Sequence, residues 1–367
     1  MTAATTVAAS YPSTAQSNSL SGTVSYMGEL SNGMMHGQGV LLYQSGVRYE
    51  GSFVNGKRHG PGKLLYPVQP TQPGEPIRYT IVEGTFKDDE LVGDGTVTYP
   101  NGEKYVGQIK DGTMHGFGTY YYRNGDKHTG HWINGLRYGH GVMIFAANET
   151  TGEEKYDGEW KADRMDGWGK YYHADGSVYE GEWADGKMHG RAKFYYANGN
   201  VYEGQFAFDV KHGWGELIYA KGGRYRGSWV NDVAEGQGEV IYEGGEIYKG
   251  SFVAGVKSGP GELIFTTGER LQGTWENDRL VGRGRMIYEN GNVYEGQFED
   301  DLCHGFGVLY DKATNTRYEG NWVNGQRHGQ GTVYFPDGGY AAGEWCEGRP
   351  VKLTYTFPSN SPWVNPN

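Results

Sequence analysis

A unit of 23 residues recurs along almost the whole chain. The copy from Tyr179 to Val201 reads YEGEWADGKMHGRAKFYYANGNV, and copies of equal length begin at Tyr202 and Tyr225. Numbered from its first residue, the unit has Gly at position 3 and usually Trp or Phe at position 5. Positions 12 and 14 are usually Gly, and position 18 is usually aromatic. Such self-similarity predicts a repeat architecture, in which each unit packs only on its neighbours.

The repeat length fits one β-hairpin. Positions 7 and 8 carry turn-forming pairs: Asn55-Gly56, Asn134-Gly135, Asp185-Gly186 and Asn324-Gly325. These residue types adopt the positive φ angles that tight hairpin turns require. A second turn is predicted at positions 19 to 22, which hold Asn101-Gly102, Asn124-Gly125, Asp175-Gly176, Asn198-Gly199 and Asn290-Gly291. Positions 1–6 and 12–18 are therefore predicted to be the two strands.

Side chains alternate between the two faces of a strand. Positions 1, 3 and 5 therefore share a face, as do positions 12, 14, 16 and 18 of the second strand; in one copy these last four are Gly213, Gly215, Leu217 and Tyr219. Glycine leaves bare backbone on which a ring can lie, so the rings need no second layer of structure. The predicted fold is all-β: an elongated single-layer antiparallel sheet, a solenoid of 23-residue β-hairpin repeats.

Composition supports a thin, ring-rich core and narrows the class of partner. Glycine makes up 63 and tyrosine 30 of the 367 residues, while hydrophobic residues are only 37%. The net charge of −11 disfavours nucleic acid as a partner. Two cysteines, Cys303 and Cys346, favour a reducing compartment, so a cytoplasmic protein is expected. No apolar run has the length of about 18 residues expected of a transmembrane helix.

The chain divides into a tail, an array and a cap. Residues 1–21 lack the period and are predicted to be a disordered tail. The array is predicted over residues 22–348, with thirteen full repeats and a partial one that begins at Ala341 and does not finish its hairpin. An insertion from Pro67 to Pro76 contains four prolines and is predicted to be an extruded loop. Residues 349–367 are expected to be a C-terminal cap or tail.

The pattern YEGxWxxGxxHGxG at this period resembles the MORN (membrane occupation and recognition nexus) repeat over residues 26 to about 348. Leu30 and Ile109 replace the ring of position 5, and Ala192 replaces a strand glycine. A chain made almost wholly of such repeats resembles the MORN scaffold proteins of protist cytoskeletons. The resemblance implies a dimeric, elongated scaffold that contacts cytoskeletal proteins. The family name also implies lipid binding, which the repeat itself does not establish.

Positions 9 and 10 concentrate basic residues along the predicted hairpin ends. They include Lys57, Arg58, Lys187, Lys211 and Arg327. Such a stripe can bind phosphoinositide headgroups or an acidic partner. Ordinary solubility is the competing interpretation, because acidic residues at positions 2 and 7 neutralise much of the stripe. A phosphoinositide-binding module at the inner face of a membrane is therefore the alternative function.

Metal binding has one candidate. Seven histidines occupy position 11, but equivalent positions lie about 9.6 Å apart, which is too far for one shared ion. Cys303 and His304 are adjacent, and a twofold dimer would bring two such pairs together as a Cys2His2 zinc set. An unreactive thiol is the alternative. No other cofactor is expected.

The C-terminal end is predicted to be a dimer interface. An open strand edge favours pairing with another chain, and Tyr340, Trp345, Tyr355 and Phe357 lie there with few expected partners in their own chain. No catalytic residues are identified; a glycan-active enzyme would need paired carboxylates across a groove. The sequence therefore favours a non-enzymatic scaffold that organises a cytoskeletal or membrane-associated complex as a C-terminal homodimer.

Overall fold

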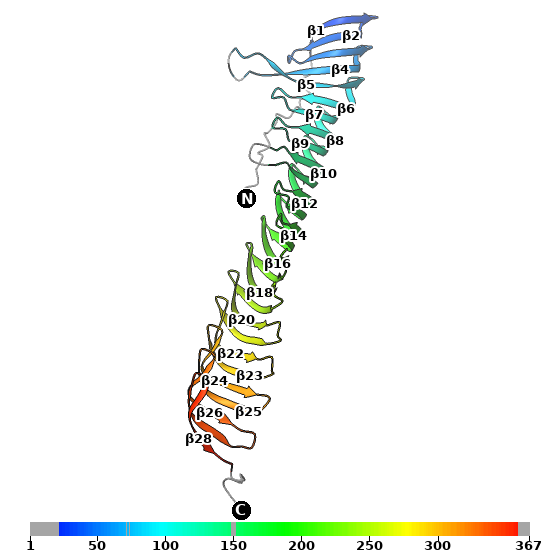
Figure 1. Ribbon diagram of the computed structural model, residues 1–367. Coiled ribbons are helices and arrows are strands. Elements are labelled where there is room, and N and C mark those ends of the chain that lie inside the picture. Colours follow the sequence, from blue (N-terminus) through cyan, green and yellow to red (C-terminus); the bar gives the residue numbers. More distant parts are fainter. Residues whose placement is uncertain (1–21, 71, 73, 148–151, 359–367) are drawn as a thin grey trace, which may run out of the picture. The chain divides into compact units, whose positions relative to one another are not determined.

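The protein is described by a computed structural model over residues 22–70, 72, 74–147 and 152–358; the predicted tail of residues 1–21 lies outside the described part. The described chain is all-β, with 28 strands in one open antiparallel sheet (Figure 1), as predicted. It contains no helix long and apolar enough to span a membrane. Two compact units, residues 1–190 and 191–367, are described separately below.

Strands that follow one another in sequence pair with each other within each unit. The first unit contains β1 (Thr23–Ser31), β2 (Met34–Tyr43), β3 (Arg48–Val54), β4 (Lys57–Val68), β5 (Arg78–Lys87), β6 (Glu90–Thr98), β7 (Lys104–Lys110), β8 (Thr113–Tyr121), β9 (Lys127–Ile133), β10 (Leu136–Phe145), β11 (Glu154–Lys161), β12 (Arg164–Tyr172) and β13 (Val178–Ala184). The boundary between the units falls in β14 (Lys187–Tyr195).

The second unit has the same hairpin order. It contains β15 (Val201–Ala207), β16 (Val210–Ile218), β17 (Arg224–Val230), β18 (Val233–Ile241), β19 (Ile247–Val253), β20 (Val256–Ile264), β21 (Arg270–Glu276), β22 (Arg279–Ile287), β23 (Val293–Glu299), β24 (Leu302–Asp311), β25 (Thr316–Val323), β26 (Gln326–Tyr334), β27 (Tyr340–Cys346) and β28 (Arg349–Thr356). Each repeat therefore supplies one hairpin.

Both predicted turns are present. Asn55 and Gly56 have φ angles of 50° and 82°, as a two-residue hairpin turn requires. In the second turn only the glycine is left-handed: Gly199 has φ 84° and donates its N–H to the carbonyl of Tyr196 at 2.9 Å. The turn chemistry read from the sequence is thus confirmed.

The second strand of each hairpin starts earlier than predicted, because it contains a bulge. In the hairpin of β15 and β16, Gly204 pairs with Gly215 and Phe206 pairs with Lys211, so Gln205 alone faces three residues. Gln205 Oε1 accepts the N–H of Trp214 at 2.9 Å and closes the bulge. The strand therefore runs from position 9 to position 17.

The bulge also corrects the predicted face of position 12. Gly213 has φ 77°, and a Cβ added to it would lie 2.1 Å from the amide oxygen of Gln205. It faces away from the rings, so this glycine serves the left-handed backbone of the bulge rather than the ring floor. Positions 3 and 14 provide the floor, as predicted.

The core consists of tyrosine rings lying on paired glycines. Tyr202 is fully buried, and a Cβ added at Gly204 or Gly215 would lie 2.5 Å or 2.3 Å from its Oη. Its hydroxyl donates to the carbonyl of Gln205 at 3.0 Å. Tyr49, Tyr105, Tyr156, Tyr248 and Tyr294 are equally buried at position 1. The ring-on-glycine packing is confirmed.

The proline-rich insertion is partly strand. β4 and β5 continue beyond the normal hairpin, with Pro67 paired with Tyr79 and Val68 with Arg78, and this hairpin projects further than its neighbours (Figure 1). The extruded connection is confirmed, but the prediction that Pro67 lies in the loop is wrong.

The last hairpin is complete, contrary to the prediction. Glu347 and Gly348 form a left-handed turn with φ 49° and 81°, and β28 pairs with β27 along its length. Residues 349–356 are therefore a strand rather than a tail. The alternating sequence Val-Lys-Leu-Thr-Tyr-Thr explains why this segment continues the sheet.

Candidate interaction surfaces

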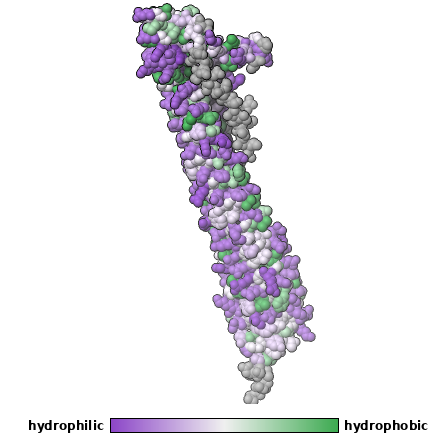
Figure 2. Space-filling view, turned by 180° about the vertical axis from the view of Figure 1, so that it is seen from behind, coloured by the Kyte–Doolittle hydropathy of each residue, from purple (hydrophilic) through white to green (hydrophobic). Residues whose placement is uncertain are grey.

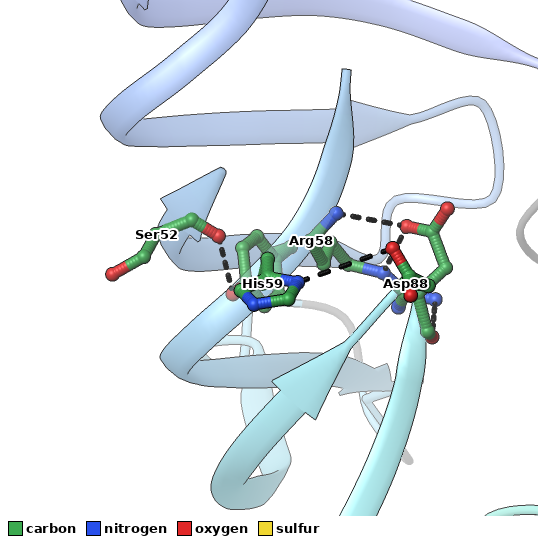
Figure 3. A network of polar contacts seen from close by, with 6 residues as sticks. Ser52, Arg58, His59 and Asp88 are labelled. Carbon is green, nitrogen blue, oxygen red and sulfur yellow. Dashed lines mark hydrogen bonds and ion pairs between the residues drawn. The ribbon is translucent and has the colours of Figure 1, made fainter. Parts of the chain in front are cut away.

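The basic residues of position 10 do not form a free stripe. The Arg58 side chain packs against the rings of Phe86 and Tyr49, with its guanidinium carbon 5.3 and 5.7 Å from their centroids. Its Nε lies 3.1 Å from Asp89 Oδ1, which also accepts the Arg58 backbone N–H at 3.0 Å. Figure 3 shows the Arg58 side chain directed at the turn that carries Asp88. Arg58 is therefore a buried packing residue.

Other position-10 cations lie in the same environment. Each packs on the position-5 ring of the following repeat. The distances from the Arg guanidinium carbon or the Lys Nζ to the ring centroid are 4.1 Å for Arg137 on Trp160, 4.6 Å for Lys211 on Trp229, 4.3 Å for Lys257 on Trp275 and 5.1 Å for Arg327 on Trp345. Burial lowers the pKa values of Lys211, Lys257 and Arg327. These contacts exchange solvation of the charge for attraction to the ring face.

The predicted headgroup stripe is therefore divided between two environments. Lys57 and Lys187, at position 9, are exposed, whereas Arg58, Lys211 and Arg327 point the opposite way into the ring layer. The reason is strand alternation, which sends adjacent side chains to opposite faces. The structure does not bring the five residues together as one anion-binding surface.

The predicted zinc pair is also separated by strand alternation. Cys303 occupies position 10 and is buried in the core, 3.8 Å from the hydroxyl of Tyr288, and burial raises the pKa of its thiol to about 11. The neighbouring His304 lies 3.3 Å from Glu299. The two side chains do not converge, and the apolar surroundings disfavour the thiolate that zinc requires. The described residues contain no group of three or more possible metal ligands.

The histidines of position 11 lie at the bulge. The backbone carbonyls of His36, His115 and His189 accept hydrogen bonds from position-1 tyrosine hydroxyls at 3.4, 3.3 and 3.2 Å. His59 Nδ1 lies 4.0 Å from Asp88 (Figure 3). These contacts are those of a packing position after the hairpin turn.

The C-terminal edge exposes apolar side chains. In other repeats, the next position-5 ring covers the end of the second strand; among the described residues, no strand follows β28. Tyr355 and Phe357 are 58% and 49% exposed, and Leu353 lies on the same strand face. Leu353 stands opposite Gly343, where other repeats have a floor glycine. Sequence reasoning missed Leu353 because it treated this segment as a tail.

Two other residues predicted for this interface have partners in their own chain. Trp345 is only 5% exposed and packs edge-on against Tyr318 at 5.3 Å, so the expectation that it lacks partners is wrong. The ring centroids of Tyr340 and Tyr334 lie 6.1 Å apart. The most exposed apolar residues at this end are therefore Val351, Tyr355 and Phe357, at 63%, 58% and 49%; Tyr340 is 39% exposed, and Leu353 is half-buried.

A hollow in the second unit was not predicted. It has a volume of about 450 Å³ and lies where Leu271 takes the place of the position-1 tyrosine, between Trp275, Met286 and Tyr288. The smaller leucine leaves space that a tyrosine ring fills in other repeats. The sequence feature that indicated this hollow was the absence of an aromatic residue at position 1 of this repeat.

The solved structures described here share little overall likeness with the chain. No curated protein matches it. The TCP domain of Drosophila melanogaster SAS-4, solved with a proline-rich motif of Ana2, shares 12% identity over 48% of this chain and 90% of that one, with a TM-score of 0.29. A point mutant of the TCP10 domain of Danio rerio CPAP shares 13% over 71% and 98%, with a TM-score of 0.24. Nothing about function follows from these low similarities.

The repeat itself gives a definite result. The MORN repeat model matches thirteen consecutive segments in the same frame as the hairpins: residues 26–48, 49–69, 83–104, 105–127, 128–150, 156–178, 179–201, 202–224, 225–246, 248–270, 272–293, 294–312 and 318–340. These segments cover most of the chain, and in the structure each one supplies a hairpin. The protein belongs to the MORN repeat family.

Proposed function

We propose that this protein is a non-enzymatic scaffold that organises a cytoskeletal or membrane-associated complex as a C-terminal homodimer. The observation that carries the proposal is the apolar face of β28, which has a partner strand on one side only. Leu353 and Tyr355 lie on that face and Phe357 follows the strand, with Tyr355 and Phe357 58% and 49% exposed. A second copy of the same edge supplies equivalent apolar groups.

The scaffold role rests on how the repeats use their side chains. Rings, glycines and position-10 cations are engaged in contacts between neighbouring hairpins, as in Tyr202, Gly215 and Lys211. A repeat array of this kind offers long surfaces for binding partners. Cytoskeletal proteins in the cytoplasm are the partners that we propose.

The dimer is tested by the molar mass of the full chain in light scattering. The expected mass is twice the 40.7 kDa of one chain. Tyr355→Glu with Phe357→Glu should give monomers, since the charges would have to be buried at the interface. Met27→Glu with Leu30→Glu is the matched control, because these residues are 75% and 62% exposed on β1. A monomeric wild type refutes the dimer, and a dimeric Tyr355/Phe357 variant locates the interface elsewhere.

The cytoskeletal role is tested by detergent extraction of source cells that express a fluorescent fusion. A scaffold bound to the cytoskeleton stays in the insoluble fraction, and the monomeric edge variant should be extracted more readily. A wild-type fusion that is fully extracted would contradict the role.

A further inference from the structure

One exposed position of the repeat alternates in chemistry with a period of two repeats. Position 13 follows the bulge glycine, and all thirteen of its residues are exposed. Counting the repeat from Tyr26 as the first, the even repeats carry Pro61, Phe117, Trp168, Trp214, Pro260 and Phe306. The odd repeats carry Gln38, Asp94, His140, Arg191, Gln237, Arg283 and Gln330. No residue breaks the alternation.

Core packing does not account for these rings. Phe117, Trp168, Trp214 and Phe306 are 53%, 50%, 51% and 57% exposed. The neighbouring position 14 faces the ring layer, so position 13 points to the opposite face, here called the outer face. Large apolar groups that stay half-exposed at a regular interval indicate a binding surface. Successive even repeats are four strands apart, which is about 19 Å.

The outer face beside this row carries paired charges. Positions 2 and 15 face each other across strands and form ion pairs: Lys170 with Glu180 at 3.0 Å, Lys249 with Glu239 at 3.0 Å and Arg285 with Glu295 at 3.2 Å. Burying such pairs under a broad partner would be costly. The view in Figure 2 shows a mostly hydrophilic surface with separate hydrophobic patches. The partner therefore contacts a narrow row.

We propose that the occupant of this row is the same row of a second copy, shifted by one repeat. Six of the seven odd-repeat residues end in an amide, an imidazole or a guanidinium group, all of them planar groups that stack on rings. A second copy has the same repeat spacing, so every ring of the row except one Phe117, which meets Asp94, lies opposite an amide, imidazole or guanidinium group of the other copy.

The molecule already contains an imidazole–ring contact and a guanidinium–ring contact of the kinds proposed. Phe117 and His131 pack on the outer face with ring centroids 5.5 Å apart. Arg137 stacks on Trp160 at 4.1 Å. The pairing requires no fixed relation between the two units, because each supplies its own row: Pro61, Phe117 and Trp168 in the first, and Trp214, Pro260 and Phe306 in the second.

Lateral pairing along this row extends the proposed scaffold function and does not involve the β28 edge. A chain with both surfaces joins end to end through β28 and side by side through position 13. Each lateral contact is small, but several act together along one array. At higher protein concentrations, where the weaker lateral contacts also form, the combination produces sheets or bundles.

The test is small-angle scattering of the full chain over a range of concentrations. Lateral pairing raises the cross-sectional radius of gyration, whereas association at β28 alone leaves it unchanged. The experiment therefore tests the lateral interface independently of the β28 interface. The ring variant combines Phe117→Gln, Trp168→Gln, Trp214→Gln and Phe306→Gln. We expect it to lose the rise in cross-section and to keep the wild-type melting temperature, because the four side chains are exposed.

The matched control removes four apolar residues from position 17, which shares the outer face: Tyr121→Gln, Tyr195→Gln, Ile218→Gln and Tyr310→Gln, at sites 45%, 39%, 47% and 44% exposed. It should associate like the wild type. A second variant, Arg191→Glu with Arg283→Glu, should weaken association without touching the rings. The proposal is overturned if the wild-type cross-section never rises, if the ring or the arginine variant associates like the wild type, or if the control loses association equally.

Discussion

Replacing Trp229 with Ala perturbs the ring layer at a site where its contacts are well defined. Trp229 is 5% exposed and lies edge-on to Tyr202 and Tyr225, at 5.5 and 5.0 Å. Lys211 Nζ lies 4.6 Å from its ring centre, and its Nε1 donates to the carbonyl of Gly215 at 3.2 Å. The substitution therefore removes packing, a hydrogen bond and the partner of a buried cation together.

The expected loss of unfolding free energy follows from these contacts. Truncation of a buried Trp to Ala costs about 3–5 kcal/mol. We expect the upper part of that range, because Gly215 loses a hydrogen-bond donor and Lys211 loses its ring. Trp229→Phe is the matched control: it keeps a ring and loses mainly the hydrogen bond, worth about 1 kcal/mol. Phe206, Phe252 and Phe298 occupy this position natively in other repeats.

Hydrogen exchange is the appropriate assay, because repeat arrays open locally rather than in one step. Trp229→Ala should accelerate exchange in β15 to β18, the two hairpins that its ring joins, and leave β23 to β26 protected. Trp229→Phe should behave nearly as the wild type. If the Ala variant exchanges at the wild-type rate, or if the Phe variant is as unstable as the Ala variant, the ring layer does not hold the hairpins together.

Two further predictions concern position 3 and pH. Gly204→Ala should lower the free energy of unfolding, measured in urea, by about 1–3 kcal/mol. The loss should exceed that of Gly215→Ala, because the new Cβ at position 204 would lie 2.5 Å from the backbone of Gly215. Equal losses in the two variants would contradict this. His128 is buried at position 1, and burial lowers its pKa to about 3. The unfolded chain therefore binds a proton that the folded chain does not, and the first unit should lose stability as pH falls from about 6.5 to 3, by at most about 1.4 kcal/mol per pH unit. In thermal melts His128→Tyr, the usual residue there, should remove that dependence; an unchanged pH profile would assign it to other groups.

The sequence predicted those features that are encoded within one repeat. The Asn-Gly pairs fixed both turns, because their backbone preference is local. The spacing of Tyr202, Gly204 and Gly215 predicted rings on bare backbone, because alternation along paired strands places them on one face. These inferences needed no knowledge of neighbouring repeats.

Features that depend on neighbours or on irregular pairing were missed. The bulge at Gly213 breaks the simple alternation, so position 12 was placed on the wrong face. Arg58 appeared solvent-exposed because its partners, Phe86 and Asp89, belong to the next repeat. Trp345 was expected to have few partners for a similar reason: Tyr318 and Arg327 belong to the preceding repeat.

The position-10 contacts also address a hazard of repetition. A slip of one residue turns every side chain to the wrong face, but a slip of a whole repeat preserves the pattern of rings and glycines. Only features that differ between repeats oppose it. Where the next turn carries Asp at position 8, that carboxylate accepts the backbone N–H of position 10, as Asp89 does for Arg58 and Asp232 does for Lys211.

A chain shifted by one repeat would lose these pairs. Met114 and Ala234 stand at position 10 where the next turn carries Gly135 or Gly255 instead of Asp. The contrast between repeats is incomplete, since Arg327 already faces the Gly348 turn and Asp301 accepts the backbone N–H of Leu280. The cations predicted to form a membrane-facing stripe thus have a structural role: each packs on the ring of the following repeat, and most of them also lie beside an Asp in its turn.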